Sequence, residues 1–333
     1  MAKKLFILGN GVDWCEKSLQ GIQKHENVYL VNKKIPVYGK IKPRIAKIYF
    51  SYRINRKFKL PFKTFWYKDM KEKIKENVGI NDEICVLIYD HNVFGGEETF
   101  LKYLKKHFKN IKLAYIFTNI VNYTAAKERK YLDKLNNWYD IVFAFDPKDA
   151  EKYNFEYSPL IYDADDSYNK RDTENKDNLV FYVGQAKDRL EVLLKSYERL
   201  KELGVKCDFH IANVLDGNKK YDNEIVYNKF MSYNDAVNYI KKATCLIDII
   251  QGDSTGLTIK TCEAVCYDKK LITTNKHVKE YPFYDPRYIR VMESINDIDL
   301  DFFNENADVH YSKEGKNYFS ADSFLKRLWT LCD

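Results

Sequence analysis

Residues 247–258 read Ile247-Asp-Ile-Ile-Gln-Gly-Asp-Ser-Thr-Gly-Leu-Thr258 and encode a strand, a loop and the start of a helix. The apolar residues at the beginning predict a buried strand, and the loop is rich in glycine and in hydroxyl side chains. Lys260 and Glu263 follow within the helix. The first amides of a helix have no partner inside the helix, so this segment predicts an anion-binding site at the carboxyl end of a strand.

A second glycine turn has the same organisation. It reads Phe181-Tyr-Val-Gly-Gln-Ala-Lys-Asp-Arg189, an apolar strand that runs into a glycine and then into a helix. The backbone can approach a ligand closely at Gly184, and the forked guanidinium of Arg189 can reach a phosphate. Two strand-to-helix turns with anion-binding chemistry are therefore expected in the second half of the chain.

Short apolar strands alternate with helical segments around these motifs, which predicts parallel sheets covered on both faces. In the first half we expect strands at 4–8, 27–31, 84–89, 113–117 and 141–145, with helices at 97–108 and 125–136. In the second half we expect strands at 179–183, 206–211, 224–227, 245–250 and 270–274, with helices at 190–203, 233–242 and 258–267.

The chain is long enough for two domains, because it has 333 residues. Residues 163–178 are polar and have no apolar periodicity, which predicts a linker. We therefore expect α/β domains of the doubly wound, Rossmann-like type at 1–162 and 179–333. The last helix can pack back on the first domain.

Composition points to a soluble, cytoplasmic protein. Apolar residues make up 45% of the chain and charged residues 31%. The apolar runs are far shorter than the roughly 20 residues that span a membrane. The seven cysteines are scattered, which suits reduced thiols, and Cys262 and Cys266 have the spacing of one helix face.

Residues 31–78 form a basic and aromatic stretch. It holds fifteen Lys or Arg residues against three acids, a net charge of +12. Its aromatic residues include Tyr49, Phe50, Tyr52, Phe58, Phe62, Phe65, Trp66 and Tyr67. Such a stretch attracts phosphates, and we expect its partner to be an anionic membrane surface rather than a nucleic acid. A solvated basic face is the alternative.

Two turns in the first half carry candidate proton acceptors. Gly9-Asn-Gly11 follows the first strand and brings Asp13 with it, but the third glycine of a dinucleotide fingerprint is missing. Asp90-His91-Asn92 follows the strand at 84–89. Asp13, Asp90 or His91 could accept a proton from a hydroxyl nucleophile, or Asp13 and Asp90 could only cap a helix or a turn.

The second half resembles the donor-binding region of bacterial GT-B glycosyltransferases that build lipopolysaccharide core or capsule. The resemblance lies in Asp248-Ile-Ile-Gln251, Thr255-Gly-Leu-Thr-Ile-Lys260, Cys262-Glu-Ala264, Lys269-Lys-Leu-Ile-Thr-Thr-Asn275, the Tyr182-Val-Gly184 turn with Arg189, and Met231-Ser-Tyr-Asn-Asp235. It covers most of residues 141–290. It implies two Rossmann-like domains facing each other across a cleft.

The resemblance also implies a nucleotide-sugar donor. The base would lie near Met231 to Tyr233, the ribose near Glu263, and the diphosphate near Gly184, Arg189 and the 255–260 loop. The full set of donor-binding residues is Gly184, Arg189, Met231, Ser232, Tyr233, Gln251, Ser254, Thr255, Gly256, Leu257, Thr258, Lys260 and Glu263. No cofactor is expected.

No metal is expected either, because Asp163-Ala-Asp165 and Asp297-Ile-Asp299 lie in the linker and near the chain end. One departure concerns the paired glutamates of many retaining members. Asp253 stands where the first is expected, and Glu263 is seven residues beyond Gly256. Retention and inversion therefore both stay open.

The function expected from these residues is metal-independent hexosyl transfer. The donor is a nucleotide-sugar, and the acceptor is a bacterial surface glycan or a lipid-linked saccharide. Two alternatives stay open: a nucleotide-sugar epimerase of the same fold, and a non-enzymatic protein that binds an anionic surface or nucleic acid.

Overall fold

The structure is a computed structural model that describes residues 1–8, 14, 19–31, 45, 48–58, 60–90, 97–121, 132–164, 168, 178–304 and 308–333. The chain divides into two compact units. The first comprises residues 1–16, 22–158 and 325–333, and the second comprises residues 17–21 and 159–324.

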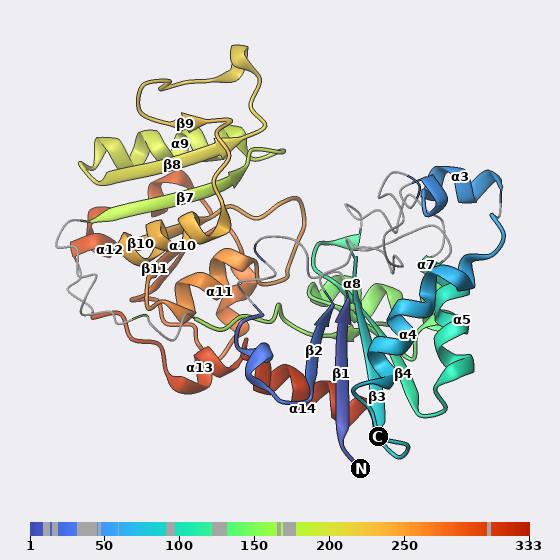
Figure 1. Cartoon of the computed structure of the whole chain (residues 1–333). Coiled ribbons are helices and arrows are strands. Elements are labelled where there is room, and N and C mark those ends of the chain that lie inside the picture. Colours follow the sequence, from blue (N-terminus) through green and yellow to red (C-terminus); the bar gives the residue numbers. More distant parts are fainter. Residues whose placement is uncertain are drawn as a thin grey trace. The chain divides into compact units, whose positions relative to one another are not determined.

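The first unit is built on a six-stranded parallel sheet (Figure 1). Its strands are β1 (Lys3–Leu8), β2 (Val28–Val31), β3 (Glu83–Tyr89), β4 (Ile111–Phe117), β5 (Ile141–Ala144) and β6 (Glu156–Tyr157), in the order β2-β1-β3-β4-β5-β6. Because all neighbours run parallel, the carboxyl ends of β3 and β4 lie at the same edge. The predicted strands of this half are confirmed.

Helices pack on one face of this sheet and share one apolar core with it. They are α4 (Lys68–Lys75), α5 (Glu97–His107), α7 (Leu132–Trp138) and α8 (Pro147–Tyr153), and the short 3₁₀ helix η2 (Lys63–Tyr67) contributes to the same core. The start of α8 follows local rules, because Asp146 accepts hydrogen bonds from the amides of Lys148 and Asp149 while Pro147 occupies the first turn. A further helix, α3 (Tyr52–Lys57), precedes η2.

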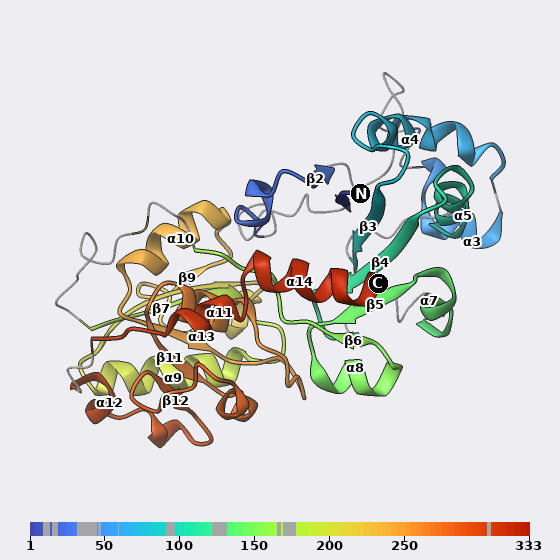
Figure 2. The same ribbon diagram turned by 90° about the horizontal axis from the view of Figure 1, so that it is seen from below.

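The last helix of the chain, α14 (Ala321–Cys332), ends in the first unit, on the other face of its sheet (Figure 2). Lys3 Nζ lies 2.5 Å from Asp333 Oδ1 and 5.6 Å from the centre of the Trp329 ring. A hydrogen bond also joins the thiols of Cys85, on β3, and Cys332. These contacts attach the end of the chain to its first and third strands.

The second unit contains another six-stranded parallel sheet. Its strands are β7 (Leu179–Gln185), β8 (Lys206–Ala212), β9 (Val226–Tyr227), β10 (Cys245–Asp248), β11 (Lys270–Thr273) and β12 (Ile289–Val291), in the order β12-β11-β10-β7-β8-β9. Parallel pairing again brings the carboxyl ends of β7 and β10 to one edge. The two predicted strand-to-helix turns both start there.

Helices cover both faces of the second sheet (Figure 2). On one face α9 (Leu190–Glu202) and α12 (Leu300–Asn304) pack on β7, β8 and β10. On the other face lie α10 (Tyr233–Lys242) and α11 (Ile259–Cys266), and a short helix, α13 (Lys313–Asn317), lies beside α11. The predicted doubly wound α/β class is confirmed. No helix in the described part of the chain is long and apolar enough to cross a membrane.

Several predicted strand bounds differ from the structure by one or two residues, and one of these differences has a clear cause. The strand expected at 245–250 ends at Asp248, because the next two residues leave the ladder. The Ile249 carbonyl accepts a hydrogen bond from Arg189, and the Ile250 amide donates to the Thr274 hydroxyl. Side chains from neighbouring turns therefore set where this strand ends.

The thiols of Cys85 and Cys332 provide a test of how α14 attaches to the first sheet. The hydrogen bond from Cys85, with the nearby positive charges of Lys112 and Lys3, lowers the pKa of the Cys332 thiol. Burial raises the pKa of Cys207 to about 12, and it also raises the pKa values of Cys245, Cys262 and Cys266. We expect iodoacetamide to modify Cys332 first, with a midpoint below that of a thiol without these neighbours.

Alkylation against pH, read by peptide mass spectrometry in a Cys15→Ser background, measures this order. Cys85→Ala should raise the midpoint of Cys332, because its hydrogen-bond donor is lost. Earlier modification of Cys207 than of Cys332 would contradict the arrangement.

Candidate active site

The loop between β10 and α11 is held in place by one buried carboxylate. Asp248, the last residue of β10, accepts hydrogen bonds at Oδ2 from the hydroxyls of Thr258, Thr261 and Thr273, at 2.8, 3.2 and 3.4 Å. Burial raises the pKa of Asp248, and the threonine hydroxyls oppose that rise. The side chain thus joins the loop, the helix and the neighbouring strand β11 at one atom.

Asn275 fixes the middle of the same loop. Its side-chain amide donates to the carbonyls of Gly256 and Thr255, at 3.0 and 3.4 Å, and it is fully buried. Gly252 begins the loop with a φ of 54°, a conformation that glycine adopts without strain. Neither Asp248 nor Asn275 was among the predicted site residues. The position of Asp248 could have indicated a site residue, because it is a carboxylate at the end of an apolar strand.

The predicted anion-binding amides start α11. Thr258 caps this helix, because its hydroxyl accepts from the amides of Lys260 and Thr261 at 3.1 and 3.4 Å. The preceding amides of Leu257 and Thr258, and that of Ile259, donate to no acceptor in the described part of the chain. Ser254, Thr255, Gly256 and Leu257 are buried in the loop before them. The geometry suits an anion at the start of α11.

Three predicted donor residues come together beneath this loop, in contact with one another. Lys260 Nζ lies 2.6 Å from Glu263 Oε2, and both side chains are buried. The Tyr233 hydroxyl, from α10, donates to Glu263 Oε1 at 2.6 Å and lies 3.2 Å from the Tyr162 hydroxyl. Burial and the charge of Glu263 raise the pKa values of both tyrosines, so their hydroxyls stay protonated.

This cluster changes what Lys260 can do. Its positive charge is compensated inside the protein by Glu263, whereas the sequence motif suggested a cation facing the diphosphate. Tyr162 was not among the predicted site residues, because only the folded chain brings it from the end of the first half to α10.

The turn after β7 lies beside the turn after β10. Arg189 donates from Nη1 to the Ile249 carbonyl at 2.8 Å and from Nη2 to the Gln185 carbonyl at 2.5 Å. Its Nε atom is buried without a hydrogen-bond partner among the described residues. A second link joins the ammonium of Lys187 to the side-chain oxygen of Gln251. A Cβ at Gly184 would lie 2.8 Å from the Tyr182 hydroxyl, so a larger residue there would require the Tyr182 side chain to move.

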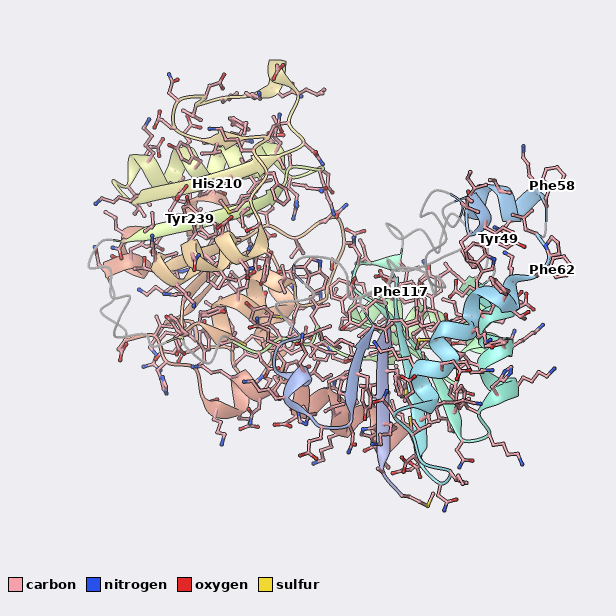
Figure 3. The ribbon with its side chains drawn as sticks, in the orientation of Figure 1. Tyr49, Phe58, Phe62, Phe117, His210 and Tyr239 are labelled. Atoms are coloured by element: carbon pink, nitrogen blue, oxygen red, sulfur yellow. The ribbon has the colours of Figure 1, made fainter. Side chains whose placement is uncertain are left out.

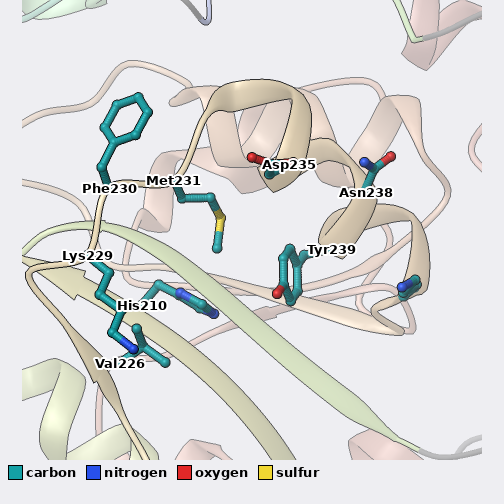
Figure 4. A pocket seen from close by; sticks show the side chains of 9 residues that line it. His210, Val226, Lys229, Phe230, Met231, Asp235, Asn238 and Tyr239 are labelled. Carbon is teal, nitrogen blue, oxygen red and sulfur yellow. The ribbon is translucent and has the colours of Figure 1, made fainter.

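The predicted base-binding segment divides into two parts. Ser232 caps α10, since its hydroxyl accepts from the Asp235 amide at 3.1 Å and donates to Asp235 Oδ2 at 2.7 Å. Met231 instead lines a pocket of about 420 Å³ between α10, β8 and β9 (Figure 4). The pocket is lined by His210, Val226, Lys229, Phe230, Met231, Asp235, Asn238, Tyr239 and Lys242.

The candidate proton acceptors lie in the first unit. Asp90, directly after β3, is buried and accepts at Oδ1 a hydrogen bond of 2.8 Å from the hydroxyl of Thr118, which follows β4. This is the carboxyl edge that the sequence predicted for Asp90. Asp13, His91 and Asn92, with the turn Gly9 to Gly11, lie outside the described residues.

Among the residues that the structure describes, no group of three His, Cys, Asp or Glu side chains is placed to hold a metal ion. Metal independence stays a prediction. Of the two pairs with carboxylate spacing, Asp165 lies outside the described residues, and Asp297 accepts hydrogen bonds from the amides of Glu293 and Ser294.

Comparison with solved structures identifies the fold. The chain is similar to the UDP-forming α,α-trehalose-phosphate synthase from Burkholderia xenovorans, with a TM-score of 0.53 and 10% identity over 100% of this chain and 99% of that one. It is also similar to AviGT4, a glycosyltransferase involved in avilamycin A biosynthesis, with a TM-score of 0.52 and 10% identity over 100% and 97%. The chain has the GT-B fold.

A third similarity covers part of a longer protein. The accessory secretory protein 1, 2 and 3 structure from Streptococcus pneumoniae matches 80% of this chain with a TM-score of 0.48 and 10% identity. The chain spans only 56% of the length of that protein. No protein-family model and no curated protein sequence matches the chain. At these identities the similarities establish the GT-B fold, and the activity has to be argued from the site.

The buried ion pair can be tested separately from activity. Lys260→Met leaves Glu263 buried without its cation, and Glu263→Gln leaves Lys260 buried without its anion. Each single change should lower the free energy of unfolding by about 3–5 kcal/mol, because an unpaired buried charge is costly. The double variant should recover most of that loss.

Urea denaturation of the four proteins measures the coupling between the two residues. Lys195→Met is a matched control, since Lys195 forms an exposed pair with Glu191 at 2.7 Å and should leave stability almost unchanged. Strictly additive losses in the double variant would show that Lys260 and Glu263 do not depend on each other.

Proposed function

We propose that the protein is a glycosyltransferase of the lipopolysaccharide-core or capsule-building type. It transfers a hexose from a nucleotide-sugar to a bacterial surface glycan or a lipid-linked saccharide. The observation that carries the proposal is the pair of turns after β7 and β10, joined by Arg189 and Lys187, beside the amides at the start of α11. A nucleoside diphosphate leaving group needs this kind of stabilisation.

The second unit is assigned to the donor. The amides at the start of α11 and the orphaned Nε of Arg189 provide donors for the diphosphate, and Asp248 and Asn275 hold the loop in position beforehand. The base is assigned to the segment around Met231. Glu263, the residue expected at the ribose, is buried against Lys260 and Tyr233, so it can contact a ribose only if this cluster opens. Preorganised donors stabilise developing charge with little reorganisation during the reaction.

The first unit is assigned to the acceptor. Asp90 lies at the carboxyl edge of its sheet, where a sugar hydroxyl could lose its proton to the carboxylate, while Thr118 orients that carboxylate. Asp13 and His91 stay alternative bases. The reaction is proposed to need neither cofactor nor metal, and the protein is proposed to act in the cytoplasm.

Asp90→Asn tests the assignment of the base. Loss of a general base lowers turnover roughly 10²- to 10⁴-fold while leaving donor affinity nearly intact. Turnover is measured on a panel of UDP-, GDP- and CMP-sugars, first as slow hydrolysis without acceptor, and donor binding is measured by calorimetry.

Asp140→Asn is the control, because Asp140 precedes β5 at the opposite edge of the same sheet. Equal turnover in Asp90→Asn and the unmodified protein would move the base elsewhere. If the panel neither bound nor turned over, the glycosyltransferase proposal itself would fail.

Membrane docking is proposed for the exposed apolar side chains of the basic segment, Ile45, Ile48, Phe58, Phe62 and Phe65, which we call the apolar tip. Phe58 is 69% exposed and Phe62 is 82% exposed (Figure 3). Three other aromatic residues of the segment, Phe50, Trp66 and Tyr67, are buried in the core of the first unit. The same segment also carries exposed lysines, Lys57 at the end of α3 and Lys68, Lys73 and Lys75 along α4.

Exposed apolar side chains in a lysine-rich segment suit an anionic bilayer, where each basic group near the surface contributes about 1 kcal/mol. We expect the protein to co-sediment with vesicles that contain phosphatidylglycerol, and less so as salt rises. Phe58→Ser with Phe62→Gly should weaken the binding. Glycine suits position 62, because Phe62 has a φ of 58°.

Phe230→Ser is the control, because Phe230 is 90% exposed in the second unit and lies outside the apolar tip. Equal sedimentation with neutral and anionic vesicles would exclude an electrostatic membrane surface.

A further inference from the structure

We propose that Lys187 is the phosphate-binding cation of the donor site, in the place that the sequence motif gave to Lys260. The inference rests on the proposed function and names the residue that selects a diphosphate over a nucleoside. Three observations support it: the left-handed backbone of Lys187, the neutral partner of its ammonium group, and the ion pair that Lys260 forms with Glu263.

The backbone of Lys187 has a conformation that side chains rarely adopt. Its φ is 47°, in the left-handed region that favours glycine. Lys187 lies in the short turn between the end of β7 and the start of α9, beside Gly184 and Arg189. Residues held in this way persist only where the surrounding structure fixes them, and they concentrate at ligand-binding turns.

The ammonium of Lys187 has only a neutral partner. It bonds to the side-chain oxygen of Gln251, and Arg189 bonds to the carbonyls of Ile249 and Gln185. Neither cation forms an ion pair with a carboxylate in the ranges that the structure describes. Two positive charges therefore converge on the turn after β10 without a compensating anion within contact distance.

The electrostatics of this turn agree with that geometry. Partial burial of the ammonium and then the charge of Arg189 lower the pKa of Lys187, and only Asp188 opposes them. Asp248 lies near Arg189, but its Oδ2 already accepts three threonine hydroxyls. A phosphate that replaced the Gln251 oxygen would relieve the repulsion between the two cations.

Lys260 cannot take this role without breaking a buried pair. Its ammonium lies 2.6 Å from the carboxylate of Glu263, whose side chain is inaccessible to solvent. Lys187 is exposed as a residue, although its ammonium is partly removed from water, and that ammonium is held only by an amide oxygen. Of the two lysines, Lys187 can exchange its partner for a ligand at the lower cost.

Calorimetric titration with UDP, UMP, uridine and inorganic pyrophosphate tests the role. The proteins are the unmodified chain, Lys187→Gln and Lys187→Gly, with Lys195→Gln as an exposed control on α9. GDP, GMP and guanosine form a second series, since the base is not assigned. Removing one charge-assisted phosphate contact should weaken UDP or GDP and pyrophosphate about tenfold or more, and leave the nucleosides unchanged.

Lys187→Gly separates binding from folding. Glycine suits the left-handed conformation, so this variant should melt at the same or a higher temperature and yet lose the preference for the diphosphate. A merely structural lysine would give the opposite pattern, with altered melting and unchanged preference.

The outcomes separate the role of Lys187 from the proposed glycosyltransferase function. If the unmodified protein binds UDP or GDP and both variants keep its preference for the diphosphate, the role of Lys187 is wrong and the proposed function stands. If no nucleotide binds but pyrophosphate binds and is weakened in both variants, the proposed function fails and Lys187 remains an anion-binding residue. If nothing binds, both fail.

Discussion

The second unit depends on a carboxylate that is buried at the end of a strand. Asp248 accepts hydrogen bonds from the hydroxyls of Thr258, Thr261 and Thr273, which belong to a loop, a helix and a neighbouring strand. Removing a carboxylate from water is unfavourable, and the hydroxyl donors offset that cost only if all three segments keep their positions. Arg189 and Asn275 complete the arrangement from the two sides of the same loop. The shape of the proposed donor site is therefore a condition of folding this unit.

Charge is distributed unevenly among the basic groups of this site. Lys260 is neutralised by Glu263, Arg189 is mostly occupied by backbone carbonyls, and Lys187 is held by a neutral amide. A motif read from the sequence treats the three cations as equivalent. In the folded chain each has a different partner, so each differs in what it can offer to a ligand.

Much of the fold could be predicted from the sequence, because strands buried on both faces are nearly continuous apolar runs and helices have a different period. The Lys260–Glu263 pair could also have been predicted from the sequence, since residues three apart share a helix face. The contact of Tyr233 and Tyr162 with Glu263 was not, because it joins three distant segments. Nothing in a lysine signals a left-handed backbone, so the turn at Lys187 could only be seen in the structure.

The first unit is made of chain segments that are far apart in sequence, and this has a consequence for how the protein is made. Residues 1–158 leave the ribosome first, but the unit also includes residues 325–333 at the end of α14. At a synthesis rate of about 5–20 residues per second, the apolar sheet face awaiting α14 stays uncovered for on the order of ten seconds or more. An apolar surface exposed for that long is prone to aggregate and is of the kind that chaperones protect. Completion of the first unit is therefore coupled to completion of the second.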